Sequence, residues 1–361
     1  MRLGVLGVGL IGGSIGLAAG RRLEAEVVGF DPDPGTVERA LAAGAIAEAA
    51  PSAAAASAGA DVVFCAAPVG ALAGLAREAL AAGGPETVVT DVGSTKREIV
   101  AALGEDERFI GGHPLAGAET AGVENARADL FEGARWYLTP TSRAGGVLYD
   151  KLQRTVAELG ARPQAIDAET HDRLMATVSH LPHVIANVLA GQALEELSRD
   201  SERLPEVGPS LRDTTRVAGA NPAIWRDIFA TNREALAEAV DGTVARLREA
   251  AELIRSGEPG AVDEWHAGAG ADRRALLDAD RSGGPLRELR VHVPNRPGTV
   301  AELALALGRA GVNIEDMALH PAQDMTSGAV SLWVAGDEQA TRAAELVREL
   351  GHSVGIVGAG E

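Results

Sequence analysis

A glycine-rich segment near the start of the chain has the spacing of a dinucleotide-binding turn. An apolar run at 2–7 leads into a GxGxxG pattern that comprises Gly7, Gly9 and Gly12 and encloses Leu10 and Ile11. These glycines permit a tight turn and close backbone approach to a pyrophosphate, which the N-terminus of the next helix attracts. Asp31 ends the following apolar run, where a carboxylate can bind ribose hydroxyls and repel a 2′-phosphate. We therefore expect NAD as the cofactor.

A serine and a histidine occupy two further segments that follow apolar runs. Ser94 lies in DVGSTK at 91–96, and His113 begins HPLAGAE at 113–119. We expect both segments to be loops that open at the carboxyl edge of the sheet, beside the dinucleotide turn. A neutral imidazole can take a hydroxyl proton as hydride leaves carbon, so these residues indicate alcohol oxidation. Pro68, after a third apolar run, either borders the cofactor or only ends its strand.

Two histidines lie in a long helical pattern in the second half of the chain. His180 and His183 are three positions apart, so they share one face of a helix. We expect Pro182, between them, to bend that helix. The pair either binds substrate or only caps carbonyl groups that the proline leaves unbonded.

Two arginines and a tryptophan follow in the same region. Arg212 and Arg216 are four positions apart, hence on one helical face, and Trp225 comes nine residues later. A guanidinium offers a planar fork that matches a carboxylate, so this group indicates an anionic substrate. The alternative is a solvated helix face with a tryptophan in the core.

The order of apolar runs and helical patterns predicts three domains. Short apolar strands alternate with helices over 1–165, as in a Rossmann-type doubly wound α/β sheet, although 49–60 stays unassigned. Helical patterns alone cover 166–282, and we expect an all-helical domain for substrate binding and dimerisation there. The last segment, 287–361, reads as βαββαβ, the order of a ferredoxin-like α+β unit.

Composition limits the compartment and the partners. A net charge of −18 argues against nucleic acid and anionic membrane surfaces. No uninterrupted apolar run is long enough for a membrane helix and no signal peptide is evident, so we expect a cytoplasmic protein. Cys65 is the single cysteine, which excludes an internal disulfide and a cysteine-based metal site. We expect no bound metal.

Five ordered motifs resemble those of the prephenate dehydrogenase family, and the resemblance covers essentially the whole chain. They are GVGLIGGSIG, DVGSTK, GGHPLAGAE, SHLPH and TRVAGANPAIWRDIF. The resemblance implies an oxidoreductase that carries out the NAD-dependent oxidative decarboxylation of prephenate to 4-hydroxyphenylpyruvate in tyrosine biosynthesis.

The resemblance also implies a role for each motif residue. It makes His113 the catalytic histidine that bonds the ring hydroxyl, and Ser94 the residue that orients this hydroxyl and the nicotinamide. It assigns carboxylate binding to Arg216 and substrate binding to His183. It places four more residues near the substrate, which are His180, Arg212, Glu119 and Trp225. Some relatives carry lysine at the position of Arg212, so that role depends on a side chain of different reach.

The C-terminal βαββαβ pattern resembles an ACT domain, a module that pairs between chains and binds amino acids. The expected effector residues near its first turn are Asn295, Arg296, Pro297, Gly298 and Asn313. Tyrosine is the expected effector, and a homodimer is the expected assembly. The alternative is a module that only supports dimerisation.

Three other functions remain open. Arogenate dehydrogenase shares the motifs, and its substrate has an amino acid side chain where prephenate has a keto acid. An NAD-binding amino-acid sensor without catalysis would also need the C-terminal module. A β-hydroxyacid dehydrogenase or imine reductase would typically use a lysine of the helical domain, but 166–282 contains none.

Overall fold

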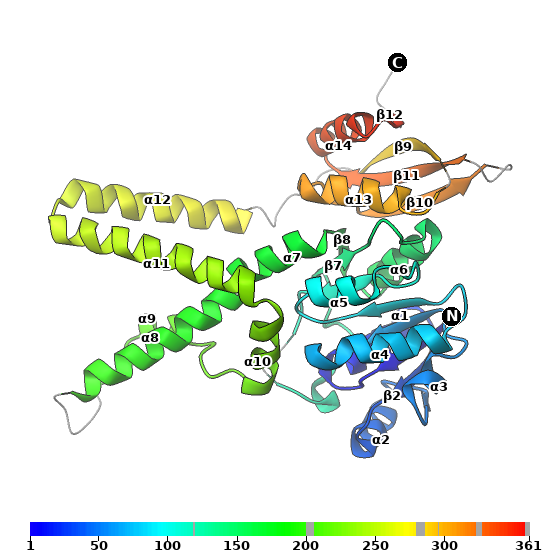
Figure 1. Ribbon diagram of the computed structural model, residues 1–361, viewed down its shortest axis with the longest axis horizontal. Helices are drawn as coiled ribbons and strands as arrows, with labels where there is room; N and C mark the ends of the chain where they lie inside the picture. Colours follow the sequence, from blue (N-terminus) through cyan, green and yellow to red (C-terminus); the bar gives the residue numbers. More distant parts are fainter. Residues whose placement is uncertain (118–119, 200–205, 279–285, 295, 323–326, 358–361) are drawn as a thin grey trace. The chain divides into compact units, whose positions relative to one another are not determined.

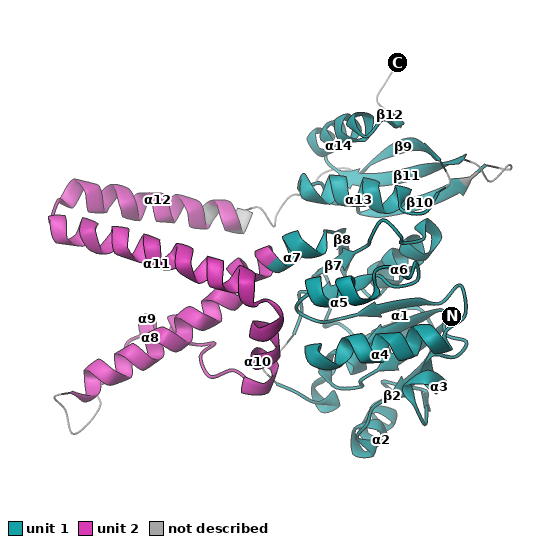
Figure 2. Cartoon of the chain, in the orientation of Figure 1, with its two compact units in different colours: residues 1–172, 285–361 teal, residues 173–284 magenta. Residues whose placement is uncertain are grey.

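The chain forms two compact units in a computed structural model that describes residues 1–117, 120–199, 206–278, 286–294, 296–322 and 327–357. One unit comprises residues 1–172 and 285–361, and the other comprises residues 173–284 (Figure 2). The C-terminal segment therefore packs with the N-terminal domain. The division into three domains with the boundaries expected above stays a prediction.

The first unit begins with a parallel sheet in the order β3-β2-β1-β4-β5 (Figure 1). Its strands are β1 (Arg2–Leu6), β2 (Glu26–Phe30), β3 (Glu48–Ala49), β4 (Val62–Cys65) and β5 (Val88–Asp91). The intervening helices are α1 (Leu10–Arg22), α2 (Pro34–Ala42), α3 (Ala53–Ser57), α4 (Val69–Ala82) and α5 (Arg97–Leu103). The register pairs Leu6 with Cys65 and Cys65 with Asp91, so the loops after these strands open on one edge. This topology confirms the Rossmann-type fold.

The segment left unassigned at 49–60 contains the end of β3 and the short helix α3. Ser52 begins this helix, because its Oγ accepts a hydrogen bond from the N–H of Ala55 at 3.1 Å. Alanine repeats carry little periodic signal, so the cap is the feature that sets the helix start. Cys65 is buried and unbonded to another cysteine, in agreement with core packing.

A second, three-stranded sheet follows in the order β6-β7-β8. It comprises β6 (Gly111–Pro114), β7 (Arg135–Thr139) and β8 (Arg162–Ala165), with a 3-10 turn at Val123–Asn125 and helix α6 (Gly146–Glu158) between strands. Phe109 forms a parallel bridge with Val89 of β5, and Ile110 donates to the Val89 carbonyl at 3.0 Å. The chain thus enters β6 alongside β5, and β6 ends near the same carboxyl edge.

The C-terminal module has the expected βαββαβ order. It comprises β9 (Leu286–Pro294), α13 (Thr299–Arg309), β10 (Asp316–Pro321), β11 (Ser327–Ala335), α14 (Asp337–Glu349) and β12 (Ser353–Ile356). Its antiparallel sheet has the order β10-β11-β9-β12, which confirms the ferredoxin-like prediction.

This module packs tightly against the rest of the first unit. A Cβ at Gly298, whose φ is +84°, would lie 2.4 Å from the carbonyl oxygen of Ser142, and a Cβ at Gly308 would lie 2.0 Å from that of Ala165. No side chain larger than hydrogen fits at either glycine. At the end of α13, Arg309 Nε donates to Asp167 Oδ2 at 2.9 Å.

Asp167 also begins the next helix, α7 (Ala168–Met175). Its Oδ1 accepts the N–H of Thr170 at 2.9 Å, and its carbonyl accepts the N–H of His171 at 2.9 Å. One carboxylate thus holds both the C-terminal module and the start of α7.

The described residues of the second unit contain helices and no strands, which confirms an all-helical domain. These helices are the end of α7, a π turn (Ala176–His180), α8 (Leu181–Ser198), α9 (Pro209–Thr214), α10 (Pro222–Thr231), α11 (Arg233–Ser256) and α12 (Pro259–Asp278). A π turn precedes Pro182, where Leu181 N–H donates to the Ala176 carbonyl, and the expected bend at Pro182 stays a prediction. Pro182 lies in the first turn of α8 and needs no donor there.

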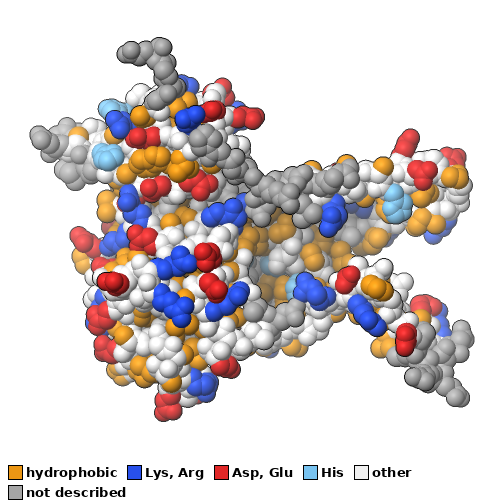
Figure 3. Space-filling view, turned by 180° about the vertical axis from the view of Figure 1, so that it is seen from behind, with side chains coloured by type: hydrophobic (Ala, Val, Ile, Leu, Met, Phe, Trp, Pro, Cys, Tyr) orange, Lys and Arg blue, Asp and Glu red, His pale blue; other side chains and the backbone are white. Residues whose placement is uncertain are grey.

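The continuous helical run Ala168–Ser198 passes the length and composition test for a membrane span, with a mean hydropathy of 1.2 in its most apolar window. The expectation above concerned uninterrupted apolar runs. This helix is apolar on average over its window, although polar residues interrupt it. Only 22% of that window is buried. Its exposed apolar side chains include Val178, Ile185, Val188 and Leu194. Figure 3 shows apolar side chains among charged ones on the helices of the second unit.

Candidate active site

The dinucleotide turn after β1 has the backbone geometry that its glycines predict. Gly7 has a φ of +95°, and a Cβ there would lie 2.3 Å from the Ala66 carbonyl oxygen. A Cβ at Gly12 would lie 1.8 Å from the carbonyl oxygen of Gly7, so α1 packs too closely against the turn for any side chain at this position. Nothing lies within 4 Å of a Cβ at Gly9, the N-cap of α1. Backbone N–H groups at the first turn, where Leu10 and Ile11 lie, can therefore approach a phosphate.

Asp31 lies at the end of β2, beside this turn. Its Oδ2 accepts the N–H of Val8 at 3.1 Å, and its Oδ1 accepts the N–H of Asp33 at 3.0 Å. These bonds hold the carboxylate at the edge where a ribose would lie next to the pyrophosphate. Pro68 follows β4 and is the N-cap of α4, on the same edge. The residues present thus fit the adenosine and pyrophosphate parts of a dinucleotide.

A buried ion pair supports the loop after β5. Lys96 and Asp91 are both fully buried, and Lys96 Nζ bonds Asp91 Oδ2. Asp91 also accepts the N–H of Gly93 at 2.8 Å and that of Gly112 at 3.2 Å. Burial lowers the pKa of Lys96, and the Asp91 carboxylate opposes that effect. Half-buried Ser94 is carried by this loop.

His113 lies within strand β6, whereas the sequence analysis placed it in a loop. His113 pairs with Tyr137 of β7, and the preceding Gly112 donates its N–H to the Asp91 carboxylate. The GG before it carries no strand signal, yet a Cβ at Gly112 would lie 2.6 Å from the Asp91 carbonyl oxygen. Close strand approach, which only glycine permits, therefore explains the pattern. The side chain of His113 is 9% exposed.

A second histidine and a carboxylate, both missed by the sequence analysis, continue inward from His113. His113 Nδ1 lies 2.9 Å from His171 Nε2, and His171 Nδ1 lies 2.8 Å from Asp172 Oδ1. Asp172 also accepts the backbone N–H groups of Lys96 at 2.7 Å and Arg97 at 2.9 Å. His171 and Asp172 are fully buried on α7. The one sequence feature that points to these two residues is the adjacent His-Asp pair early in a helix.

In the second unit, the side chains of His183 and Trp225 lie against each other. Their ring centroids are 3.5 Å apart with an interplanar angle of 30°, a stacked arrangement. A cavity of ≈ 290 Å³ is lined by both rings and by Asn187, Gly219, Arg226 and Phe229. Burial lowers the pKa of His183, the backbone bond to Val217 opposes this shift, and the Arg216 charge acts in the same direction as burial, so the neutral imidazole is favoured.

His180 and the remaining predicted residues have different environments. His180 is 1% exposed, its Nδ1 lies 3.1 Å from Asn232 Nδ2, and its ring meets Trp225 edge-on at 6.0 Å. Arg212 is exposed on α9, but this helix ends at Thr214 and the exposed Arg216 lies beyond it, so the two arginines do not share a helical face as expected. Glu119 lies outside the described residues. No group of three or more His, Cys, Asp or Glu side chains in the described part of the chain could hold a metal ion.

Two family models match consecutive parts of the chain. The prephenate dehydrogenase nucleotide-binding domain matches residues 16–164, and the prephenate dehydrogenase dimerization domain matches residues 167–266. Their boundary falls at the start of α7. The C-terminal module lies beyond both matches.

Whole-chain comparisons agree with these models. A prephenate dehydrogenase from Bacillus subtilis (strain 168) is 28% identical over 350 residues, which is 94% of each chain. The crystal structure of prephenate dehydrogenase from A. aeolicus in complex with hydroxyphenyl propionate and NAD+ is 30% identical, with a TM-score of 0.72 over 76% of this chain and 98% of that one. The Synechocystis arogenate dehydrogenase structure is 26% identical, with a TM-score of 0.68 over 76% of this chain and all of that one. The chain belongs to the prephenate dehydrogenase family.

Proposed function

We propose that this chain catalyses the NAD-dependent oxidative decarboxylation of prephenate to 4-hydroxyphenylpyruvate in tyrosine biosynthesis. The observation that carries the proposal is His113, held by a buried histidine and carboxylate beside the carboxyl edge of a dinucleotide-binding sheet. An imidazole at that edge is suited to take the proton of an alcohol during its oxidation. The A. aeolicus relative was crystallised with NAD+ and a hydroxyphenyl ligand, which fits this chemistry.

The proposed roles follow from the chemistry of each residue. When bound, NAD accepts hydride from the substrate ring. His113 takes the proton of the ring hydroxyl, and Ser94 orients that hydroxyl. Gly7, Gly9, Gly12 and the first turn of α1 bind the pyrophosphate, Asp31 binds the adenosine ribose, and Pro68 borders the cofactor. Because loss of carbon dioxide with aromatisation is strongly favourable, orientation is most of what the protein must supply.

Residues of the helical unit are proposed to bind the substrate. Arg216 and His183 bind its carboxylates, with Trp225 packed against His183 and His180 held behind Trp225. A neutral His183 brings no charge to a carboxylate, so the charge must come from arginine. Arg212 and Glu119 are proposed as further residues near the substrate.

Replacing Arg216 with Ala is expected to raise KM for the substrate by about 10- to 100-fold, because a charge-assisted bond to a carboxylate is lost. Steady-state kinetics with NAD in excess measures this change. Arg248→Ala, at an exposed position on α11, is the matched control and should change KM by less than about threefold. Weakened NAD binding in Arg216→Ala would remove Arg216 from the substrate site.

The substrate preference is the main alternative within this chemistry. The Synechocystis relative is an arogenate dehydrogenase, and the motifs do not separate the two substrates. A side-by-side assay of NADH production with prephenate and with arogenate decides the matter. We expect faster turnover of prephenate. Turnover of neither substrate, in protein that binds NAD, would favour an NAD-binding sensor without catalysis.

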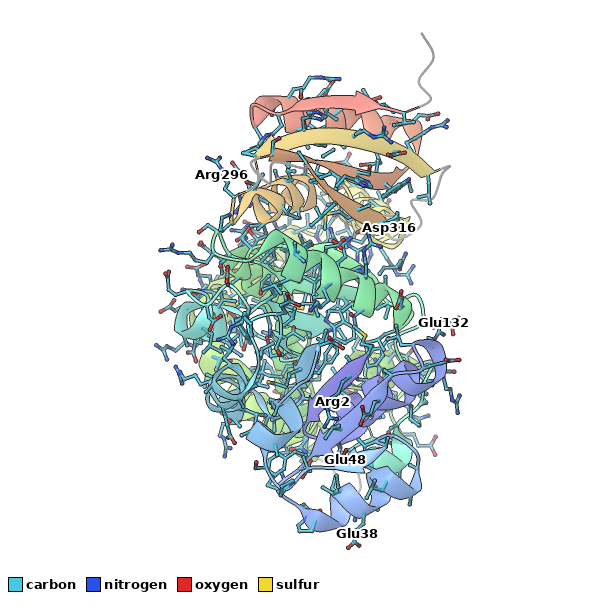
Figure 4. All side chains as sticks on the ribbon, turned by 90° about the vertical axis from the view of Figure 1, so that its right-hand side faces the viewer. Arg2, Glu38, Glu48, Glu132, Arg296 and Asp316 are labelled. Atoms are coloured by element: carbon cyan, nitrogen blue, oxygen red, sulfur yellow. The ribbon has the colours of Figure 1, made fainter. Side chains whose placement is uncertain are left out.

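The C-terminal module is proposed to be an ACT domain that binds tyrosine. A cavity of ≈ 470 Å³ in the first unit is lined by Lys151, Arg296, Pro297, His320 and the apolar Leu148 and Val330. Arg296 projects beside the start of α13 (Figure 4). Gly298 instead contacts Ser142, and Asn313 donates to Glu315 Oε1 at 2.8 Å. Asn295 lies outside the described residues.

Calorimetric titration with tyrosine tests this role of the module. Binding should weaken in Arg296→Ala, because a cation near the cavity can hold the effector carboxylate. Absence of heat with every aromatic amino acid would leave dimerisation as the function of the module.

We also propose a cytoplasmic homodimer. The family model for residues 167–266 is that of a dimerization domain, and the exposed apolar residues of α8 are suited to meet a second copy. Light scattering of the purified chain should give twice the monomer mass. A monomer at micromolar concentration would contradict the proposal.

A further inference from the structure

Three buried groups form a line that ends at the proposed base. Asp172 contacts His171, and His171 contacts His113, with atom separations of 2.8 and 2.9 Å. The line joins α7 to β6, and His113 and His171 are 58 residues apart in the chain. The rings of His113 and His171 meet at an interplanar angle of 71°, with centroids 5.1 Å apart. An edge-on approach of this kind brings one ring nitrogen to another.

The direction of each hydrogen bond follows from the inner end of the line. Asp172 accepts two backbone N–H groups, from Lys96 and Arg97, so its carboxylate is held as an acceptor. An ionised carboxylate has no proton to give, so the bond to His171 requires a proton on His171 Nδ1. A neutral imidazole protonated at Nδ1 carries its lone pair on Nε2, the atom that faces His113.

The surroundings of His171 favour that neutral form. Burial lowers the pKa of His171, and the charge of Lys96 on the β5–α5 loop acts in the same direction. Asp172 on α7 and Asp91 on β5 oppose the shift. From β7, the ring of Tyr137 packs edge-on against His171 at 5.7 Å. Lys96 and Asp91 are paired to each other, and Asp172 is the carboxylate bonded to His171, so one N–H on His171 Nδ1 is enough for that bond.

We infer that His171 and Asp172 fix the tautomer of His113, so that Nδ1 of His113 carries the proton and Nε2 carries the lone pair. This inference rests on the proposed function, in which His113 is the base. His171 is then a positioning residue and does not itself exchange protons with substrate. Because free imidazole samples both tautomers, the line of bonds keeps His113 in the one form whose outer nitrogen can act.

The proton and electron balance needs no transfer beyond His113. The hydroxyl O–H bond breaks as its proton moves to Nε2, and the ring C–H pair leaves as hydride to NAD. The departing carbon dioxide leaves its bonding pair in the ring, and the resulting phenolate recovers the proton. The imidazolium formed in between is stabilised because its Nδ1–H donates to His171.

Two substitutions at His171 separate this role from a merely structural one. Leu lacks an acceptor, whereas Gln can place an amide oxygen near the position of Nε2. His171→Leu should lower kcat by about 10- to 100-fold, leave KM within about twofold, and move the acid limb of the kcat/KM profile to lower pH. His171→Gln should keep a wild-type profile and most of kcat.

Asp172→Asn is the third variant, because it keeps the volume and removes the charge. Asp172 Oδ1 accepts from both the Lys96 N–H and His171, so the amide oxygen should take that position and leave the amide N–H group near Arg97. His171 should then keep its tautomer, and we expect kcat to fall by less than in His171→Leu. Thermal unfolding and NAD binding establish that each variant is folded.

A direct readout does not depend on activity. In wild-type protein labelled with ¹⁵N-histidine, the signal that His113→Asn removes should show the proton on Nδ1. A proton on Nε2 overturns the inference, as does a folded His171→Leu enzyme with wild-type kcat, or equal losses in His171→Leu and His171→Gln. If wild type oxidises neither prephenate nor arogenate, the proposed function fails, while the ¹⁵N spectrum still decides the tautomer.

Discussion

Replacing His113 with Asn should lower kcat by about 10²- to 10⁴-fold and leave KM for the substrate nearly unchanged. The amide can occupy the same space and still accept or donate a hydrogen bond, but it cannot take a proton at neutral pH. The loss therefore appears in the chemical step and not in binding. Single-turnover measurement of NADH formation at saturating substrate isolates that step.

The control for this substitution is NAD affinity. Asp31 and the glycine turn hold the cofactor in our proposal, so His113→Asn should bind NAD as wild type does. Wild-type turnover of both prephenate and arogenate by this variant would disprove the assignment of the base.

Replacing Lys96 with Met should destabilise the first unit by about 3–5 kcal/mol, because Asp91 would become a buried charge without its cation. Both side chains are fully buried, and the carboxylate would keep only the backbone N–H groups of Gly93 and Gly112. Urea unfolding measures the loss. Activity should also fall, because Asp91 holds both the Ser94 loop and the strand of His113.

The double variant Lys96→Met with Asp91→Asn provides the matched comparison. Removing both charges leaves a neutral amide that can still accept one backbone N–H, so part of the lost stability should return. A double variant that is less stable than Lys96→Met alone would show that the carboxylate acts mainly through its backbone bonds.

The sequence predicts the fold well where the pattern is local. The glycine turn, the strands of the parallel sheet and the βαββαβ order each depend on residues close together in the chain, and the structure confirms them. The segment at 49–60 was left open because repeated alanine has no periodic face. The π turn before Pro182 could not be foreseen, since it is a shift of one backbone hydrogen bond.

The candidate site shows where such reasoning fails. Ser94 and His113 stand in recognisable motifs, whereas His171 and Asp172 matter through contacts with residues 58 and 76 positions away. Lys96 stands in the DVGSTK motif, but the motif does not predict its burial, because a lysine near a loop is usually exposed. Only the folded chain shows that it is fully buried and paired.

The carboxylate of Asp167 connects the C-terminal module to the helix that carries His171. Arg309, at the last turn of α13, donates to one oxygen of Asp167. The other oxygen accepts the N–H of Thr170 and so caps α7, the helix on which His171 lies. A ligand that displaced the C-terminal sheet would disturb the Asp167 carboxylate, which is only four residues from His171. Feedback of the kind proposed for tyrosine would then act through the tautomer of His113 and would not need to block the cofactor site.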